Sequence, residues 1–238
     1  MQKKNLFQEL FFSNKNFVWR ENFFIMKKKN ERSGKKMSTK EKLFAVLISP
    51  SRKYWDSYYQ ACQESEKAGE RSFLHDLKEF AHLKKGEDNN FAAYQKGITR
   101  QLYFENVNGE SKMLNVPSTT YWLVDEKEYI GIGILRHRLT KAIEEYGAHI
   151  GYAIRLGKRN QGYGTILLRF LLQEAYRFKI NPALITCSED NIASKTLIEH
   201  AGGILRDKLP STEHGKPITL CRYWVKTDPK SIQKNKRS

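Results

Sequence analysis

The sequence predicts an α+β fold in which a mixed sheet carries helices on its faces. Three observations lead to this prediction. A strand–turn–strand pattern covers 119–135, strand and helix patterns then alternate from 148 to 200, and a glycine-containing turn at 159–165 joins a strand to an amphipathic helix. At 238 residues, with 39% hydrophobic residues, the chain can bury one good core, so we expect one domain with extensions.

The early part of that domain reads as one strand followed by helices. Apolar residues at 42–48 predict the first strand. Helical spacing predicts helices at 52–68, 73–85 and 90–104, and Gly69 ends the first of them. Residues 106–117 read as a loop, with Asn108-Gly109 as its turn signal.

The later part builds the rest of the sheet. We expect paired strands at 119–124 and 129–135, and then a short helical piece that ends at Tyr146-Gly147. A strand at 148–155, a helix at 163–178, a strand at 184–188 and a helix at 191–200 follow. Two last strands lie near 203–209 and 218–225, around a loop at 213–215.

The domain is expected at 41–226, between a basic extension at 1–40 and a basic tail at 227–238. Most of the net charge of +16 lies in these ends, which is typical of solvated, poorly ordered termini. Residues 1–40 are also rich in phenylalanine. Three interpretations stay open: a segment on a membrane surface, a short helix docked on the domain, or residues upstream of a start at Met26 or Met37.

Composition argues against several classes of protein. No apolar run reaches the roughly 18 residues that a bilayer span needs, and no secretory signal is clear. Three cysteines without metal-ligand spacing (Cys62, Cys187 and Cys221) suggest reduced thiols, and the histidines show no zinc-binding arrangement. We therefore expect a cytoplasmic protein with no transmembrane segment and no metal.

The turn at 159–165 (Arg-Asn-Gln-Gly-Tyr-Gly-Thr) has the features of an anion site. Glycines let backbone N–H groups approach a ligand closely, and the positive end of the following helix favours phosphate. Arg155, Lys158 and Arg159 are expected to add positive charge beside it. A glycine turn by itself is equally compatible with a simple tight turn.

The order of elements, with Arg159-x-x-Gly162-x-Gly164 at a strand-to-helix turn, resembles the GNAT acetyltransferase superfamily. A second signature also resembles it: Asn191, a small residue at Ser194, and Gly202 eleven residues after the asparagine. The resemblance covers roughly 42–226. Within the superfamily, the chain resembles most specifically a bacterial branch of predicted acetyltransferases. It implies a mostly antiparallel sheet of about six to seven strands, splayed between the strands at 148–155 and 184–188.

The resemblance also implies that acetyl-CoA binds in this splay as a co-substrate. Backbone groups of Ile154 and Leu156 would hold the pantetheine arm, the N–H groups of 161–165 would hold the pyrophosphate, and the second signature would contact the arm from the other side. The implied cofactor set is Ile154, Leu156, Arg159, Asn160, Gln161, Gly162, Tyr163, Gly164, Thr165, Asn191, Ser194 and Lys195.

The implied reaction is direct transfer of the acetyl group to a primary amine of a small molecule or a protein. The family's frequent general-acid tyrosine lies seven residues after the motif asparagine, where this chain has Ile198. Candidate catalytic residues are His149, Glu189 and Tyr223, with histidine a natural base near neutral pH. Core packing for Tyr223 and helix capping for Glu189 are the competing interpretations.

Two other functions compete with the enzyme. One is a CoA-binding or regulatory module without turnover, which Ile198 favours. The other is a nucleic-acid-associated protein that works through its basic ends, against which the near-balanced charge of 41–225 argues, so we expect no specific nucleic-acid partner. The sequence does not identify the acceptor, and a homodimer is one arrangement that it leaves open.

Overall fold

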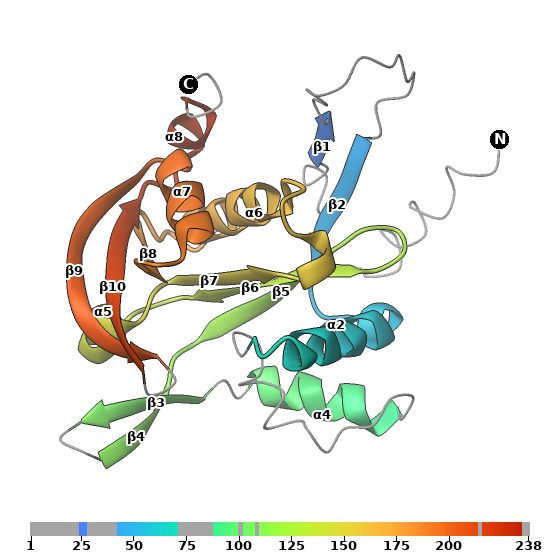
Figure 1. Cartoon of the computed structure of the whole chain (residues 1–238), viewed down its shortest axis with the longest axis horizontal. Coiled ribbons are helices and arrows are strands. Elements are labelled where there is room, and N and C mark those ends of the chain that lie inside the picture. Colours follow the sequence, from blue (N-terminus) through green and yellow to red (C-terminus); the bar gives the residue numbers. More distant parts are fainter. Residues whose placement is uncertain are drawn as a thin grey trace.

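The chain folds around one sheet of eight strands, in the order β1-β2-β5-β6-β7-β8-β10-β9. The structure is a computed structural model, and it describes residues 24–27, 42–70, 88–99, 102–107, 110–213 and 216–234. Figure 1 shows the helices α2 (Trp55–Lys67) and α4 (Asp88–Thr99) on one side of the sheet, and α6 (Tyr163–Arg177) and α7 (Ile192–His200) on the other. This arrangement confirms the predicted fold class.

The first half of the sheet is antiparallel throughout. β2 (Lys42–Ile48) pairs with β5 (Ser118–Val124), β5 with β6 (Tyr129–Arg136), and β6 with β7 (Ile150–Ile154), close to the predicted bounds. The short strand β1 (Phe24–Lys27) extends this half by pairing with β2. β1 lies inside 1–40, of which the structure describes only these four residues.

The second half of the sheet starts at β8 (Ala183–Ser188), which lies parallel to β7 and antiparallel to β10 (Lys216–Val225). β9 (Gly203–Glu213) forms the edge and pairs with β10 over ten register positions. Both last strands are longer than the sequence predicted. Their extra residues are 210–213 and 216–217, whose own preference for strand is weak and which become strand by pairing between β9 and β10.

Strand residues alternate between two hydrophobic cores. On β5, Tyr121 and Leu123 face the core under α6, whereas Trp122 and Val124 face the core under α2 and α4. This alternation follows from the period of two along a strand. Because both faces are covered, β5 is buried along most of its length, and it fixes α2 and α6 on opposite sides of the same strands.

The segment after α4 differs from the prediction. The sequence suggested that a helix continues to 104 and a loop fills 106–117, but α4 ends at Thr99 and a separate hairpin follows, formed by β3 (Leu102–Val107) and β4 (Glu110–Asn115). Apolar residues at 102–104 fit the end of a helical stripe as well as a strand, and six cross-strand register pairs decide for the strand. The helix predicted at 73–85 lies outside the described residues.

Four further short elements complete the description. They are two 3-10 turns, η1 (Arg52–Tyr54) and η2 (Leu156–Lys158), and two short helices, α5 (Lys141–Tyr146) and α8 (Pro229–Lys234). α8 lies in the predicted basic tail. Just before it, Thr227 is fully buried, and its hydroxyl donates to the carbonyl oxygen of Ile180 at 2.7 Å. The start of this tail is therefore attached to the domain.

Candidate active site

The sheet opens between β7 and β8. In the described strands the two share one register pair, Ile150 with Ile185, while β7 stays paired with β6 as far as Ile154. Beyond Ile150, the edge of β7 that faces β8 is therefore not used by the sheet. An open strand edge offers backbone groups to an extended ligand. This is the splay that the family resemblance implied.

The turn after β7 ends on the N-terminus of α6. Gly162 is the N-cap residue, with φ of 90°, a left-handed conformation that favours glycine. The first helical hydrogen bond runs from the Ile166 N–H to the Gly162 carbonyl oxygen at 3.3 Å. The N–H groups of Tyr163, Gly164 and Thr165 come before that bond, so the helix does not use them. Their position at the positive end of a fifteen-residue helix suits an anion.

Gly164 also has a packing reason. A Cβ built at this position would lie 2.9 Å from Cδ1 of Leu197 on α7. Glycine at this position therefore lets α6 and α7 come together beside the splay. Tyr163, another predicted cofactor residue, is 5% exposed and packs in the core under α6, so only its backbone can face a ligand.

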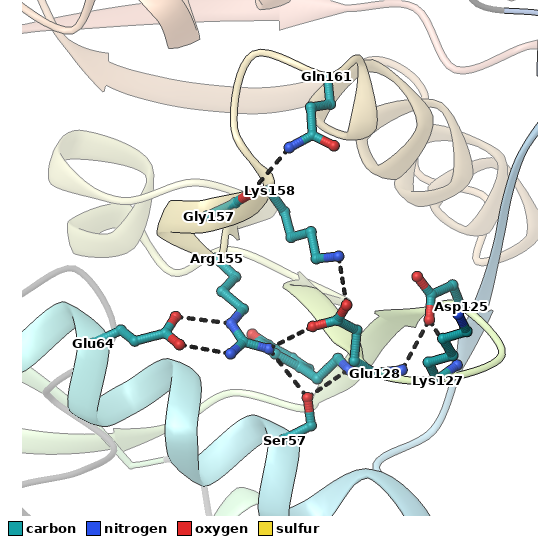
Figure 2. Close-up of polar contacts among 10 residues, drawn as sticks. Ser57, Glu64, Asp125, Lys127, Glu128, Arg155, Gly157, Lys158 and Gln161 are labelled. Atoms are coloured by element: carbon teal, nitrogen blue, oxygen red, sulfur yellow. Dashed lines mark hydrogen bonds and ion pairs between the residues drawn. The ribbon is translucent and has the colours of Figure 1, made fainter. Parts of the chain in front are cut away.

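The basic side chains around the turn are already paired with carboxylates, which corrects the expectation that they simply add positive charge. Figure 2 shows Arg155 held by Glu64 from α2 and by Glu128 from the β5–β6 turn, with nitrogen–oxygen distances of 2.6–2.9 Å. Lys158 donates to the second oxygen of Glu128 at 2.6 Å. The Arg155 side chain is only 8% exposed. Sequence spacing could not reveal these partners, because they lie on distant elements.

Arg159, the basic residue of the predicted motif, is paired as well. Its Nη1 and Nη2 donate to the two carboxylate oxygens of Glu70, each at 2.6 Å, and its Nε donates to the carbonyl oxygen of Ile154 at 3.0 Å. The contact with Glu70 balances the charge of Arg159. The contact with Ile154 uses the carbonyl of a residue whose backbone groups are expected to hold the pantetheine arm. The side chain stays 37% exposed, so a ligand can still reach it.

The remaining residues of the predicted turn are more open to solvent. Asn160 is exposed and has φ of 57°. Gln161 is partly exposed, and its side-chain amide donates to the carbonyl oxygen of Gly157 at 3.0 Å, which closes the turn on itself. Leu156 is partly exposed in η2. These residues line the approach to the N-terminus of α6.

The second signature forms the first turn of α7. Asn191 is the N-cap residue, and its side-chain oxygen accepts a hydrogen bond from the Ser194 N–H at 3.0 Å. Asparagine at this position satisfies an N–H that the helix cannot. The Ser194 hydroxyl lies 3.2 Å from the hydroxyl of Tyr152 on β7, and Lys195 follows on the same turn, partly exposed. The structure therefore places this signature across the opening from β7.

His149 holds the closed end of the splay. Its backbone N–H donates to the Leu184 carbonyl oxygen, and the ring Nδ1 accepts a hydrogen bond from the Leu184 backbone N–H, both at 2.9 Å. Burial lowers the pKa of His149 to about 4, so the ring is neutral near pH 7. Because Nδ1 is occupied, the proton sits on Nε2. This geometry favours a structural role over the predicted role of general base.

Glu189 and Tyr223 also have partners. Glu189 forms an ion pair with Lys208, and this hydrogen bond lowers the pKa of the carboxyl group. Helix capping, the alternative for Glu189, falls to Asn191 instead. Tyr223 is 1% exposed in the core and donates to Glu199 at 3.1 Å; burial first, and then Glu199, raise its pKa. That geometry fits the packing interpretation of Tyr223.

One residue of this site was missed from the sequence. Tyr152 was read only as part of a strand, although it lies on the same face as Ile150 and Ile154 and is partly exposed at the opening. Burial raises its pKa to about 12. Only the contact with Ser194, 42 positions along the chain, shows that this side chain crosses from the strand to α7.

An open hollow of about 660 Å³ adjoins the turn on the side of α2. Its lining joins the end of α2, the β5–β6 turn and η2: Glu64, Lys67, Ala68, Glu128, Arg155, Leu156, Gly157 and Lys158.

In the part of the chain that the structure describes, no three His, Cys, Asp or Glu side chains come together as a metal site. None of the described helices is long and apolar enough to cross a bilayer.

Several solved structures with a similar fold are described as acetyltransferases. One, from Salmonella typhimurium, modifies the N-terminal serine of ribosomal protein L7/L12; it is 19% identical over 77% of this chain and 95% of its own, with a TM-score of 0.51. The microcin C7 self-immunity acetyltransferase MccE, in complex with acetyl-CoA and AMP, is 15% identical over 76% and 92%, with a TM-score of 0.50. The spermidine/spermine N-acetyltransferase SpeG of Vibrio cholerae is 14% identical over 82% and 99%, with a TM-score of 0.50.

Sequence comparison identifies the family. A search of curated protein sequences found no match to this chain. The profile of the GNAT acetyltransferase domain, in contrast, matches residues 71–204, which is more than half of the chain and includes both signatures. The chain therefore belongs to the GNAT acetyltransferase domain family.

Proposed function

We propose that this protein is an acetyl-CoA-dependent N-acetyltransferase that moves the acetyl group directly to a primary amine of a small molecule or a protein. One observation carries the proposal. The N-terminus of α6, with first-turn N–H groups that the helix does not use, follows directly on the strand whose edge is left open by the splay. An extended ligand with an arm attached to a pyrophosphate fits both features at once.

Coenzyme A has this shape and charge. Its pantetheine arm would run along the open edge of β7, with its pyrophosphate at Gly162 to Thr165. Asn191, Ser194 and Lys195 would border the arm from α7. The solved neighbours that contain acetyl-CoA or coenzyme A support this assignment. Arg159 would contribute only after its pairing with Glu70 loosens.

The reaction balances as an aminolysis. A neutral amine attacks the thioester carbonyl carbon, a C–N bond forms, the C–S bond breaks, and the amine loses one proton. An alkyl amine with a pKa near 10.4 needs about 4.6 kcal/mol to reach its neutral form at pH 7. A general base, acting through water, offsets part of this cost. Of the three candidates, Glu189 is the most accessible, because its carboxylate is partly exposed just after β8, and it would act as the base only when its ion pair with Lys208 opens.

The acceptor is an amine in the proposal because the similar folds handle amines. Their named acceptors are a protein N-terminus and polyamines. These two classes differ in size and charge, and the described residues do not choose between them. A panel of N-terminal peptides and polyamines therefore belongs in the first assay.

A second candidate function is a module that binds coenzyme A without turnover. The observation that favours it is the acid position, where Ile198 is fully buried in the core. Release of free thiol from acetyl-CoA with any amine of the panel would exclude this alternative. Binding without any release across the panel would favour it.

The binding site is tested with two variants of Gly162. In Gly162→Asp a carboxylate is placed where the pyrophosphate would lie, so calorimetry should show acetyl-CoA binding at least tenfold weaker than to the unchanged chain, because like charges repel. Gly162→Asn is the matched control, with the same shape and the same left-handed backbone but no charge, and it should bind within about threefold. Equal loss in both variants would contradict an anion site at this turn.

A further inference from the structure

The leaving sulfur needs a partner that the expected residue cannot supply. Ile198 occupies the position of the family tyrosine and is fully buried, so it offers no polar group to the opening. An unperturbed thiolate, with a pKa of about 8.5, leaves with modest help, and an oriented hydrogen-bond donor is such help. A side chain at the opening that carries an O–H or N–H group would supply this help.

Tyr152 is the tyrosine that lies at the opening. It follows Ile150, the last β7 residue paired with β8, by two positions. Its hydroxyl lies 3.2 Å from the Ser194 hydroxyl in the first turn of α7. The phenol therefore crosses the gap that β7 and β8 leave, between the two elements proposed to border the pantetheine arm.

The surroundings keep Tyr152 protonated. Burial raises its pKa to about 12, and the nearby Cys187 side chain acts in the same direction, whereas the hydrogen bond with Ser194 opposes it. The neutral phenol is thus the form present near pH 7. The Ser194 hydroxyl can accept a hydrogen bond from the phenol or donate one to its oxygen, and it holds the ring in place in either case.

Tyr223, the sequence candidate for this role, is committed elsewhere. It is 1% exposed, and its hydroxyl donates to the carboxylate of Glu199 on α7. A donor already bound to a carboxylate has a stronger acceptor than a thioester sulfur. Of these two tyrosines, Tyr152 is the one whose proton can turn to a ligand at the opening.

We propose that the Tyr152 hydroxyl donates a hydrogen bond to the departing sulfur of coenzyme A. The proposal rests on the acetyl transfer proposed above. As the C–S bond breaks, the electron pair stays on sulfur, and the phenol O–H turns from Ser194 to the developing thiolate. The amine proton leaves through water, and the thiolate later takes a proton from solvent. Tyr152 thus keeps its own proton and stabilises charge rather than completing an acid–base cycle.

The first test uses binding alone, so that it needs no known acceptor. Calorimetry compares coenzyme A with desulfo-coenzyme A at pH 7 and pH 9. A donor that lowers the bound thiol pKa by one unit makes coenzyme A bind about sixfold more tightly at pH 9 than at pH 7, relative to desulfo-coenzyme A. In Tyr152→Phe this gain should vanish, while desulfo-coenzyme A binds as before.

The matched control is Tyr121→Phe. Tyr121 is a buried strand tyrosine in the same core, and its hydroxyl donates to Glu174 at 3.2 Å, away from the splay. It should keep the full gain at pH 9. With any amine that is acetylated, Tyr152→Phe should lower kcat by about 10²-fold and leave KM for acetyl-CoA unchanged, as expected for loss of a donor to developing charge.

The outcomes separate this proposal from the proposed function. If the unchanged chain binds coenzyme A without extra affinity at pH 9, or if Tyr152→Phe keeps that gain, the role of Tyr152 is wrong and acetyl transfer stands. If the unchanged chain binds neither coenzyme A nor acetyl-CoA, the proposed function itself fails, and the role of Tyr152 with it.

Discussion

Arg159 shows how a motif residue acquires a partner that the motif does not contain. Glu70 follows the end of α2 and occupies both terminal nitrogens of the guanidinium. A bound pyrophosphate would compete with this carboxylate for the same nitrogens. Exposed pairs of this kind contribute about 0.2–1 kcal/mol, and both side chains are about one third exposed. The competition is therefore weak enough for a ligand to win.

Removing the competitor should strengthen cofactor binding. In Glu70→Gln, Arg159 is released toward the ligand, and acetyl-CoA should bind about two- to fivefold more tightly by calorimetry, with a steeper dependence on salt. Glu66→Gln, an exposed position near the end of α2 with the same change in charge, should have little effect. Weaker binding in Glu70→Gln would show instead that Glu70 positions Arg159 for the ligand.

At the scale of elements, Arg155 joins three segments that are far apart in the sequence. Its side chain connects η2, beside the turn at 159–165, with Glu64 and Ser57 of α2 and with Glu128 of the β5–β6 turn (Figure 2). Since the guanidinium is buried, this connection is specific in geometry as well as in charge. α2 and the turn at 159–165 should therefore respond together to a change at this residue.

Arg155→Gln tests this connection. Loss of the cation leaves Glu64 and Glu128 without their main partner, but both are about one third exposed and water can hydrate them. We expect a loss of about 1–3 kcal/mol in the free energy of unfolding, measured by urea denaturation, together with weaker acetyl-CoA binding.

Arg222→Gln is the control for this change. Arg222 is also 8% exposed and forms a paired contact with Asp207 at 2.5 Å, but on β10, away from the turn. It should lose similar stability and keep its affinity for acetyl-CoA. Equal loss of affinity in both variants would mean that Arg155 acts only through general stability.

At the scale of the whole molecule, the sheet consists of two antiparallel halves that meet at one place. β7 ends the first half and β8 begins the second, and their contact is the Ile150–Ile185 pair with the two His149–Leu184 hydrogen bonds. His149 therefore holds the halves together where the opening starts. A charged imidazolium cannot accept the Leu184 N–H at Nδ1.

Stability should consequently depend on pH through His149. Its pKa is about 4 in the folded chain and about 6.5 when unfolded, so the unfolded state binds more protons between these values. The stabilisation is complete above pH 6.5 and is lost as pH falls toward 4, up to about 3 kcal/mol. His149→Asn keeps an acceptor oxygen at this position and should flatten this part of the curve, as urea denaturation at pH 7, 6 and 5 would show. Equal slopes in both proteins would contradict it.

The hydrophobic pattern of the sequence predicted helices and strands correctly where tertiary contacts favour the same structure as the pattern. The strand at 42–48, the helix that starts at 163 and the strand pair at 118–136 all lie close to their predicted bounds. Prediction failed at 102–115, because residues that suit both a helix and a strand were decided by pairing across a turn. For the candidate site, the turn and its helix were predicted, but not the partners of its charged residues.

The sequence by itself determined the order of elements from 118 onward, the glycine turn before α6 and the family, because these depend on local spacing and on glycine. Only the tertiary structure decided which charges are free to act. It pairs Arg159 with Glu70, uses the His149 side chain for a hydrogen bond with Leu184 across the sheet, and places Tyr152 against Ser194. These contacts join residues from 35 to 89 positions apart. No local pattern encodes such a distance, because it is set by how the strands and helices pack.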